Sequence, residues 1–144
     1  DFERYALGAA LAAQAALPAL KRSGQGSVVL FSSIAAGQGF AMHASIGMAK
    51  AAVSGLTLNL AAELAPAVRV NAIAPSLTQT PLSAQLWRNP ATAEGIAGMH
   101  PIPRLGTADD MAALAAFLLS EQASWITGQI IGVDGGRSSL RAKG

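Results

Sequence analysis

The sequence predicts an α/β fold in which helices cover both faces of a parallel β-sheet. Short apolar runs rich in β-branched residues indicate strands, and long helical patterns separate each run from the next. Strands separated by helices pair in parallel through right-handed crossovers, which gives a doubly wound sheet. The length of 144 residues fits one domain, so we expect a single core over residues 1–144.

The composition excludes several classes of protein. Hydrophobic residues make up 51% of the chain and charged residues 12%, which is too apolar for intrinsic disorder. No cysteine is present, so disulfides, zinc-cysteine sites and thiolate nucleophiles are excluded, and a cytoplasmic protein is expected. Because few charges cover the apolar surface, oligomerisation is favoured.

Neither a nucleic acid nor a membrane is an expected partner. The basic clusters at 21–22 and 137–143 contain no interleaved aromatic residues. The alanine-rich first 20 residues open with Asp1 and Glu3, and Gln14 interrupts their apolar run. This segment therefore matches neither a signal peptide nor a membrane span.

The first half of the chain predicts two helices and two strands. The first helical pattern covers residues 5–20, and the apolar run at 27–31 predicts a strand buried on both faces of the sheet. A second helical pattern covers residues 43–64 and carries Lys50. Residues 68–74 predict the next strand, which ends at Pro75.

The second half begins with a long, proline-rich segment. Residues 76–104 are predicted to be irregular and to form a substrate lid or binding loop. Thr107 is expected to cap a helix together with Asp110, and that helix runs on to Leu119. Residues 126–133 predict a turn and a third strand.

No Gly-x-Gly-x-x-Gly pattern, the usual phosphate-binding turn after a first strand, occurs in the chain. Gly135 and Gly136 follow a final strand and precede no helix, so they are not expected to bind phosphate. The sequence therefore looks like the second half of a larger fold.

Four motifs in order carry a family resemblance: VVLFSS at 28–33, KAAV at 50–53, RVNAIAP at 69–75 and ITGQIIGVDGG at 126–136. Together they resemble the short-chain dehydrogenase/reductase family, in particular its 3-oxoacyl-carrier-protein-reductase-like members, over almost the whole chain. The resemblance implies a Rossmann-type fold that apparently lacks its N-terminal half. It also implies hydride transfer between NAD or NADP and an alcohol or carbonyl substrate.

The resemblance assigns catalytic roles to Ser33 and Lys50. Ser33 matches the family serine, whose hydroxyl stabilises charge on the substrate oxygen. Lys50 matches the lysine that binds the nicotinamide ribose and lowers the pKa of a neighbouring phenol. From the residues alone, Ser33 could equally satisfy backbone groups at a strand end, and Lys50 could be a solvated surface residue.

Further cofactor contacts are implied at Pro75, which ends the strand, and in the loop that follows it. Ser76 stands where the family usually has glycine, which narrows the permitted backbone angles. Thr78 and Thr80 match positions that bind the carboxamide, although both could be ordinary loop residues. An apolar substrate pocket or a packed lid is expected from five side chains: Leu82, Leu86, Trp87, Ile96 and Met99.

The sequence departs from the family at the proton-transferring residue. Ile46 stands four residues before Lys50, where the family has tyrosine, and isoleucine cannot transfer a proton. Tyr5 stands at the position of a family asparagine; its phenol could reach toward Lys50 and the space at Ile46, or Tyr5 could simply belong to a fraying terminus. His43 and Ser45 lie nearby, but helical geometry points them away from the Lys50 face.

Two functions stay open. The first is an oxidoreductase of this family with an impaired or altered catalytic site. The second is a non-catalytic relative that acts as an oligomer partner or ligand-binding module. In either case the alanine-rich helices favour a homo-oligomer, a dimer or tetramer, because small side chains allow close helix packing across a two-fold axis.

Overall fold

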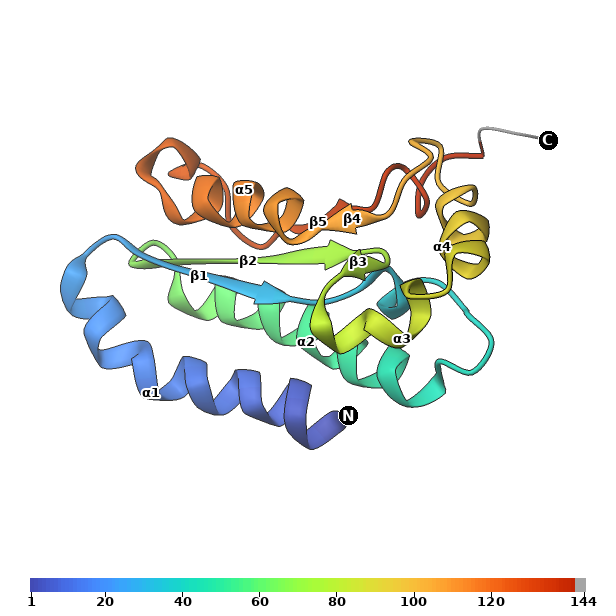
Figure 1. Ribbon diagram of the computed structural model, residues 1–144. Helices are drawn as coiled ribbons and strands as arrows, with labels where there is room; N and C mark the ends of the chain where they lie inside the picture. The colour runs from blue at the N-terminus through green and yellow to red at the C-terminus, as the bar shows by residue number, and fades with distance from the viewer. Residues whose placement is uncertain (142–144) are drawn as a thin grey trace.

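A three-stranded parallel sheet forms the centre of the computed structural model, which describes residues 1–141. The strand order is β1-β2-β5, with bounds Gly26–Phe31, Val68–Pro75 and Ile130–Val133. Helices α1 (Gly8–Ser23) and α2 (Ala44–Leu64) cover one face, and α5 (Ala108–Leu119) covers the other (Figure 1). The predicted α/β fold with a doubly wound parallel sheet is confirmed.

Two apolar clusters hold the layers together, one on each face of the sheet. Val68 and Val70 of β2 pack with Ala61 and Leu64 of α2 on the first face. On the second face, side chains of β2 and α5 pack together with the turn that follows α5: Ile73, Met111, Leu118 and Ala123. Because successive strand residues point to opposite faces, one central strand supplies both clusters.

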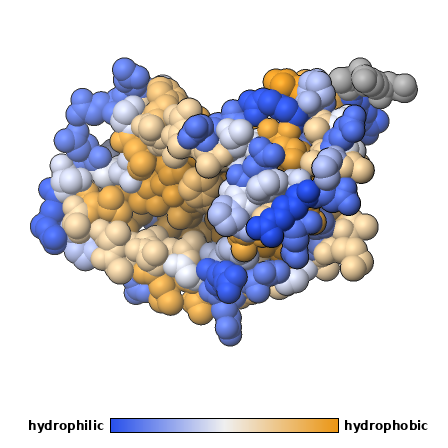
Figure 2. Space-filling view, viewed as in Figure 1, coloured by the Kyte–Doolittle hydropathy of each residue, from blue (hydrophilic) through white to orange (hydrophobic). Residues whose placement is uncertain are grey.

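The edge strand β1 differs from the prediction. Val28 and Leu30 pack against the apolar cluster on one face and Val29 against the cluster on the other, as predicted, but all three are only partly buried and Phe31 is 45% exposed. Among residues 1–141, β1 has a neighbour on one side only, whereas the four residues Asn71 to Ala74 of β2 are all buried. Figure 2 shows the apolar side chains that gather over the β1 region.

The helices follow the predicted patterns closely. A π-helical stretch, Phe2–Leu7, leads into α1, which ends at Gly24 with a left-handed φ of 70°. Helix α2 starts one residue later than predicted because His43 is its N-cap. The turn and strand predicted over residues 126–133 are confirmed, with the turn at 126–129 and the strand at Ile130–Val133.

Segment 76–104 is not irregular, which corrects the prediction. It contains a short strand and three short helical elements: β3 (Thr78–Gln79), η3 (Pro81–Ser83), α3 (Ala84–Trp87) and α4 (Pro90–Ala97). Pro81 and Pro90 open helices instead of breaking them, because proline fits the first helical position. Helices α3 and α4 lie beyond the carboxyl ends of β1 and β2 (Figure 1), and β3 pairs with β4 (Gly106–Thr107).

Arg69 ties α5 to the central strand. Its guanidinium donates hydrogen bonds to the carbonyl oxygens of Leu118 and Ala123 at 2.8 Å and of Ser120 at 3.1 Å. These carbonyls lie at or just after the end of α5, where helical carbonyls lack intrahelical partners and a cation is favourable. One side chain therefore fixes the position of this helix end against β2.

Within residues 1–141, no helix is both long enough and apolar enough to cross a membrane. The same residues contain no group of three or more histidine or acidic side chains placed to hold a metal ion. Lys143, part of the second basic cluster, lies outside the described residues.

Replacing Arg69 with methionine is expected to lower the free energy of unfolding by about 2 kcal/mol, because several carbonyl groups lose a charged donor. Urea unfolding at neutral pH measures the change. Arg88→Met is the matched control, because Arg88 is exposed. Equal unfolding free energies for the two variants would contradict this role of Arg69.

Candidate functional site

The carboxyl ends of β1 and β2 open into a cavity of about 440 Å³. Ligands of open α/β sheets bind in the crevice outside these strand ends. The cavity is lined by residues after β1, at the start of α2, after β2, in α3 and α4, and after β5: Ser33, Ile34, Phe40, His43, Ile46, Pro75, Ser76, Leu77, Thr78, Ser83, Leu86, Ile96, Met99 and Arg137. Its wall is mainly apolar, and several hydroxyl groups and one guanidinium interrupt it.

Ser33 and Ser32 are adjacent at the end of β1 but do different things. Ser32 is buried, and its hydroxyl lies 2.7 Å from the Ser54 hydroxyl and 3.1 Å from the Lys50 carbonyl, which attaches the strand end to α2. Ser33 lines the cavity and accepts a hydrogen bond from the backbone N–H of Ala35 at 3.1 Å. The hydroxyl proton of Ser33 is therefore available for a ligand oxygen.

Lys50 reaches the same strand end from α2. Its ammonium group donates to the carbonyl oxygen of Phe31 at 2.8 Å. Burial lowers the pKa of this ammonium group, because desolvation disfavours the charged form. Lys50 does not line the cavity; its ammonium group binds the carbonyl of Phe31, two residues before Ser33 in the chain.

Ile46 lines the cavity one helical turn before Lys50. An apolar side chain therefore stands where the resemblance places a phenol. Tyr5 does approach Lys50, but through the face of its ring: the ammonium nitrogen lies 4.3 Å from the ring centroid. The hydroxyl of Tyr5 makes no hydrogen bond with Lys50 within the described chain. The contact is a cation–π interaction.

His43 lines the cavity, which corrects the expectation that helical geometry turns it away. Helical geometry does not apply to His43, because this residue is the N-cap of α2 and does not have helical backbone angles. Its Nδ1 lies 2.7 Å from the carbonyl oxygen of Ala41, and its ring lies 5.6 Å from that of Phe40. Ser45 points elsewhere and donates to a carboxylate oxygen of Asp1 at 2.8 Å.

Three of the four predicted cofactor contacts after β2 meet at the cavity: Pro75, Ser76 and Thr78. Thr80 does not line it, because its hydroxyl caps η3 in a reciprocal arrangement with Ser83. Among residues 1–141, Met42 is the only non-glycine residue with a positive φ. Ser76 therefore has an ordinary backbone conformation, and the glycine usual in the family is not required here.

His100 is a site residue that sequence reasoning missed. It is 4% exposed, and its Nε2 lies 2.8 Å from the Ser76 hydroxyl, while Nδ1 lies 2.8 Å from the Ile96 carbonyl. A carbonyl only accepts, so we infer that Nδ1 carries the proton and that Ser76 donates to Nε2. A lone histidine 24 residues from its partner gives no local signal in the sequence.

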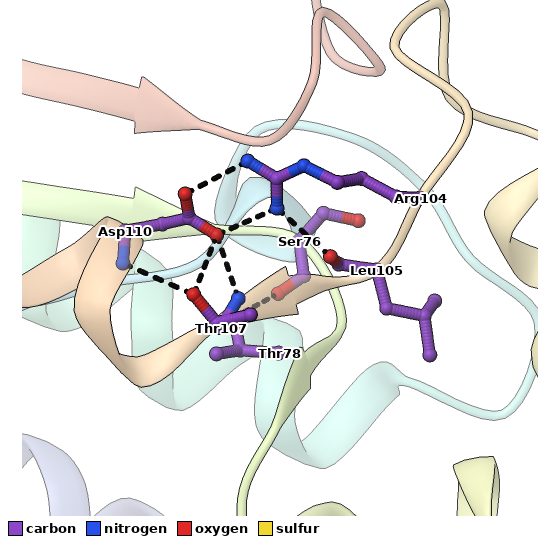
Figure 3. Close-up of polar contacts among 6 residues, drawn as sticks. All are labelled: Ser76, Thr78, Arg104, Leu105, Thr107 and Asp110. Carbon is purple, nitrogen blue, oxygen red and sulfur yellow. Dashed lines mark hydrogen bonds and ion pairs between the residues drawn. The ribbon is translucent and has the colours of Figure 1, made fainter.

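A smaller cavity of about 270 Å³ lies on the other side of Ser76 and His100, where Arg104 and Asp110 contribute to its wall. The two terminal nitrogens of Arg104 lie 2.7 and 2.8 Å from the Asp110 oxygens, a paired arrangement that can be followed in Figure 3. Thr107 also donates to Asp110 through its backbone N–H and its hydroxyl, and Thr78 donates to the Ser76 carbonyl. The predicted cap formed by Thr107 and Asp110 is confirmed.

The pKa of the Asp110 carboxyl lies well below its ordinary value. The hydrogen bonds from Arg104 are the largest cause, followed by those from the backbone N–H and the hydroxyl of Thr107. Each of them favours the ionised carboxylate over the neutral acid.

Comparison with known proteins gives consistent matches. The family profile described as "Enoyl-(Acyl carrier protein) reductase" matches residues 2–138. "Dehydrogenase/reductase SDR family member 4" of Bos taurus is 44% identical over 131 residues, which cover 90% of this chain and 47% of that protein. "Tropinone reductase-like 3" of Erythroxylum coca is 44% identical over 126 residues, which cover 88% of this chain and 48% of that protein.

Solved structures agree with these sequence matches. A short-chain type dehydrogenase/reductase from Mycobacterium ulcerans superposes with a TM-score of 0.86 at 39% identity, covering 93% of this chain and 49% of the other. A gluconate 5-dehydrogenase from Burkholderia cenocepacia, in complex with NADP and tartrate, has a TM-score of 0.87 at 27% identity. The match covers 93% of this chain and 53% of the other. The chain spans about half the length of the curated relatives that it matches.

The lowered pKa of Asp110 predicts an acid-sensitive contribution to stability. The contribution is present above the ordinary aspartate pKa of about 3.9 and is lost as the pH falls through that value toward the lower folded-state pKa. Asp110→Asn is expected to flatten the acid limb of urea unfolding midpoints measured between about pH 6 and pH 3. Asp109→Asn, at the exposed neighbouring position, should keep the wild-type profile; the same flattening in both variants would argue against Asp110.

Proposed function

The chain belongs to the short-chain dehydrogenase/reductase family, and from that premise we propose that its cavity binds an alcohol or carbonyl substrate for hydride exchange with NAD or NADP. The observation that carries this proposal is the arrangement of Ser33 and Lys50. They come from β1 and α2 and meet at one strand end, Ser33 in the cavity wall and Lys50 through the carbonyl of Phe31.

The residues present fit a nicotinamide cofactor in part. The Lys50 ammonium group has one hydrogen bond within residues 1–141, to Phe31, so donors remain for ribose hydroxyls. Pro75, Ser76 and Thr78 would hold the carboxamide, since they line the cavity. Thr80 does not fit this role, because its hydroxyl is used in a helix cap. The bound cofactor would supply or accept the hydride.

Ser33 would act on the substrate oxygen. Its hydroxyl is fixed by the N–H of Ala35 and keeps its own proton for donation. A donor placed in a largely apolar cavity stabilises charge on the oxygen more strongly than one in water does. Among the lining residues, Ile34, Leu86 and Ile96 would exclude water from the reacting group.

Ile46 makes the proposed catalytic site an altered one. Without a phenol at this position, the site lacks the proton-transferring group of the family, and His43 is the titratable side chain that remains in the cavity wall. This observation also supports the alternative, in which the chain binds a ligand or a second copy without turnover. Exposed apolar side chains on the outer helices, among them Leu11, Met48 and Leu58, favour a homo-oligomer in both cases.

The first prediction from this proposal concerns cofactor binding. Titration of the full chain with NADH and with NADPH, followed by cofactor fluorescence, is expected to show micromolar binding of at least one of them. Lys50→Ala should weaken it about tenfold, because a charged donor to the ribose is lost. Lys21→Ala, an exposed lysine on α1, is the control. A folded chain that binds neither cofactor would favour the non-catalytic alternative.

The second prediction concerns proton transfer. Ile46→Tyr is expected to raise the rate of cofactor-dependent carbonyl reduction by about 10² to 10⁴, the usual contribution of a general acid. Oxidation of NADH or NADPH with a panel of ketones measures the rate. Ile46→Phe restores the ring without the hydroxyl and should give no gain. Equal rates for the two variants would show that the phenol proton is not what the site lacks.

A further inference from the structure

Arg137 brings a positive charge to the wall of the 440 Å³ cavity. It lies in the turn after β5 and carries the only permanent charge among the lining residues. The rest of the wall is apolar or carries hydroxyl groups, apart from His43. A cation on an apolar wall is costly unless an anion or several acceptors meet it.

The guanidinium of Arg137 is held in place by weak partners. Its central carbon lies 5.0 Å from the centroid of the Phe40 ring, in a cation–π contact. One terminal nitrogen donates to the Ser76 hydroxyl at 3.3 Å, and the other faces the Met99 sulfur at 3.4 Å. Since arginine has five N–H donors and thioether sulfur is a weak acceptor, these contacts orient the group without satisfying it.

Nearby carboxylates do not neutralise Arg137. The two oxygens of Asp134, three residues earlier, accept backbone N–H groups of its own turn at 2.8 and 3.1 Å. Asp110 is paired with Arg104, the only ion pair within residues 1–141. The charge of Arg137 therefore has no carboxylate partner in the described part of the chain.

The surroundings of Arg137 are organised before any ligand arrives. Gln38 donates to the carbonyl of Ser138, which ties the loop carrying Phe40 to the turn carrying Arg137. The Ser76 hydroxyl donates to buried His100, so its oxygen presents a lone pair to Arg137. A preorganised guanidinium loses little conformational freedom when it binds an anion.

We propose that Arg137 binds a carboxylate on the substrate, so that the substrate class is oxo acids or hydroxy acids with a short apolar body. This inference rests on the proposed function for the reacting carbonyl or alcohol, but anion binding itself is independent of it. The planar guanidinium matches a carboxylate through paired hydrogen bonds. A single cation on an apolar wall favours this singly charged group over a phosphate, which carries more charge.

Carboxylate selectivity of the cavity tests the proposal without any cofactor. Isothermal titration calorimetry at low ionic strength compares hexanoate with hexanamide, a neutral probe of the same length. The full chain is expected to bind hexanoate about tenfold more tightly, the effect of one charge-assisted pair. In Arg137→Gln the ratio of hexanoate affinity to hexanamide affinity should fall to about one. In Arg137→Lys, which keeps the charge but not the planar fork, this ratio should take an intermediate value.

A matched control separates the role of Arg137 from a general effect of net charge. Arg88→Gln changes the net charge equally at an exposed position outside the cavity, and it should keep the wild-type ratio. If thermal melting shows that Arg137→Gln is unfolded, the ratio in Arg137→Lys decides: a wild-type value overturns the inference, and an intermediate one supports it.

Further results would overturn the inference: no binding of hexanoate, equal binding of the two probes by the wild-type chain, a wild-type ratio in folded Arg137→Gln, or tighter binding of hexyl phosphate than of hexanoate. Displacement of hexanoate by NADP⁺ would also overturn it, by assigning Arg137 to the cofactor. Failure to bind NADH or NADPH would contradict the proposed function but leave carboxylate binding intact, so the two failures are distinguishable.

Discussion

Burial of the central strand is the constraint on which the rest of the structure depends. β2 pairs with β1 on one side and β5 on the other, and it contributes to the apolar clusters on both faces of the sheet. At its amino end, Arg69 fixes the end of α5, and Asn71, which is fully buried, holds the turn before β5. At its carboxyl end, Ser76 meets His100 and Arg137. The cavity thus lies at the end of a strand that is paired on both sides and largely buried.

Features that depend on local chemistry could be predicted from the sequence. The cap formed by Thr107 and Asp110 needs only residues three positions apart. The helical patterns at 5–20 and 43–64 are likewise local features, and they predict α1 and α2. The burial of a strand also depends on its neighbours, which is why residues 27–31 were expected to be buried although β1 is an edge strand in the described chain. Likewise, proline at the first position of a helix looks like proline in a loop, so α4 could not be anticipated.

In the candidate site too, residues in local motifs could be predicted from the sequence, and residues brought together by the fold could not. Ser33 and Lys50 could be proposed because they stand at recognisable positions in known motifs, and the structure brings both to one strand end. His100 and Arg137 could not, because the fold alone brings them to Ser76, across 24 and 61 residues of chain. Neither has a neighbouring residue that marks it as part of a site. Such contacts follow from tertiary packing and not from sequence spacing.

The same cavity combines a hydroxyl donor and a guanidinium with an apolar residue at the position of the acid/base. Ligand binding and proton transfer have separate requirements. Binding depends on the side chains that line the cavity, and proton transfer depends on a titratable group within hydrogen-bond distance of the reacting oxygen. Ile46 lies on α2, whereas Ser33 follows β1 and Arg137 lies in the turn after β5, so the residue at position 46 can differ without disturbing the other two. The wall can therefore retain a substrate preference even where turnover is slow. In the proposed function, the residues for recognition come from the ends of β1 and β2 and from the turn after β5, whereas the position of the proton-transferring group carries Ile46.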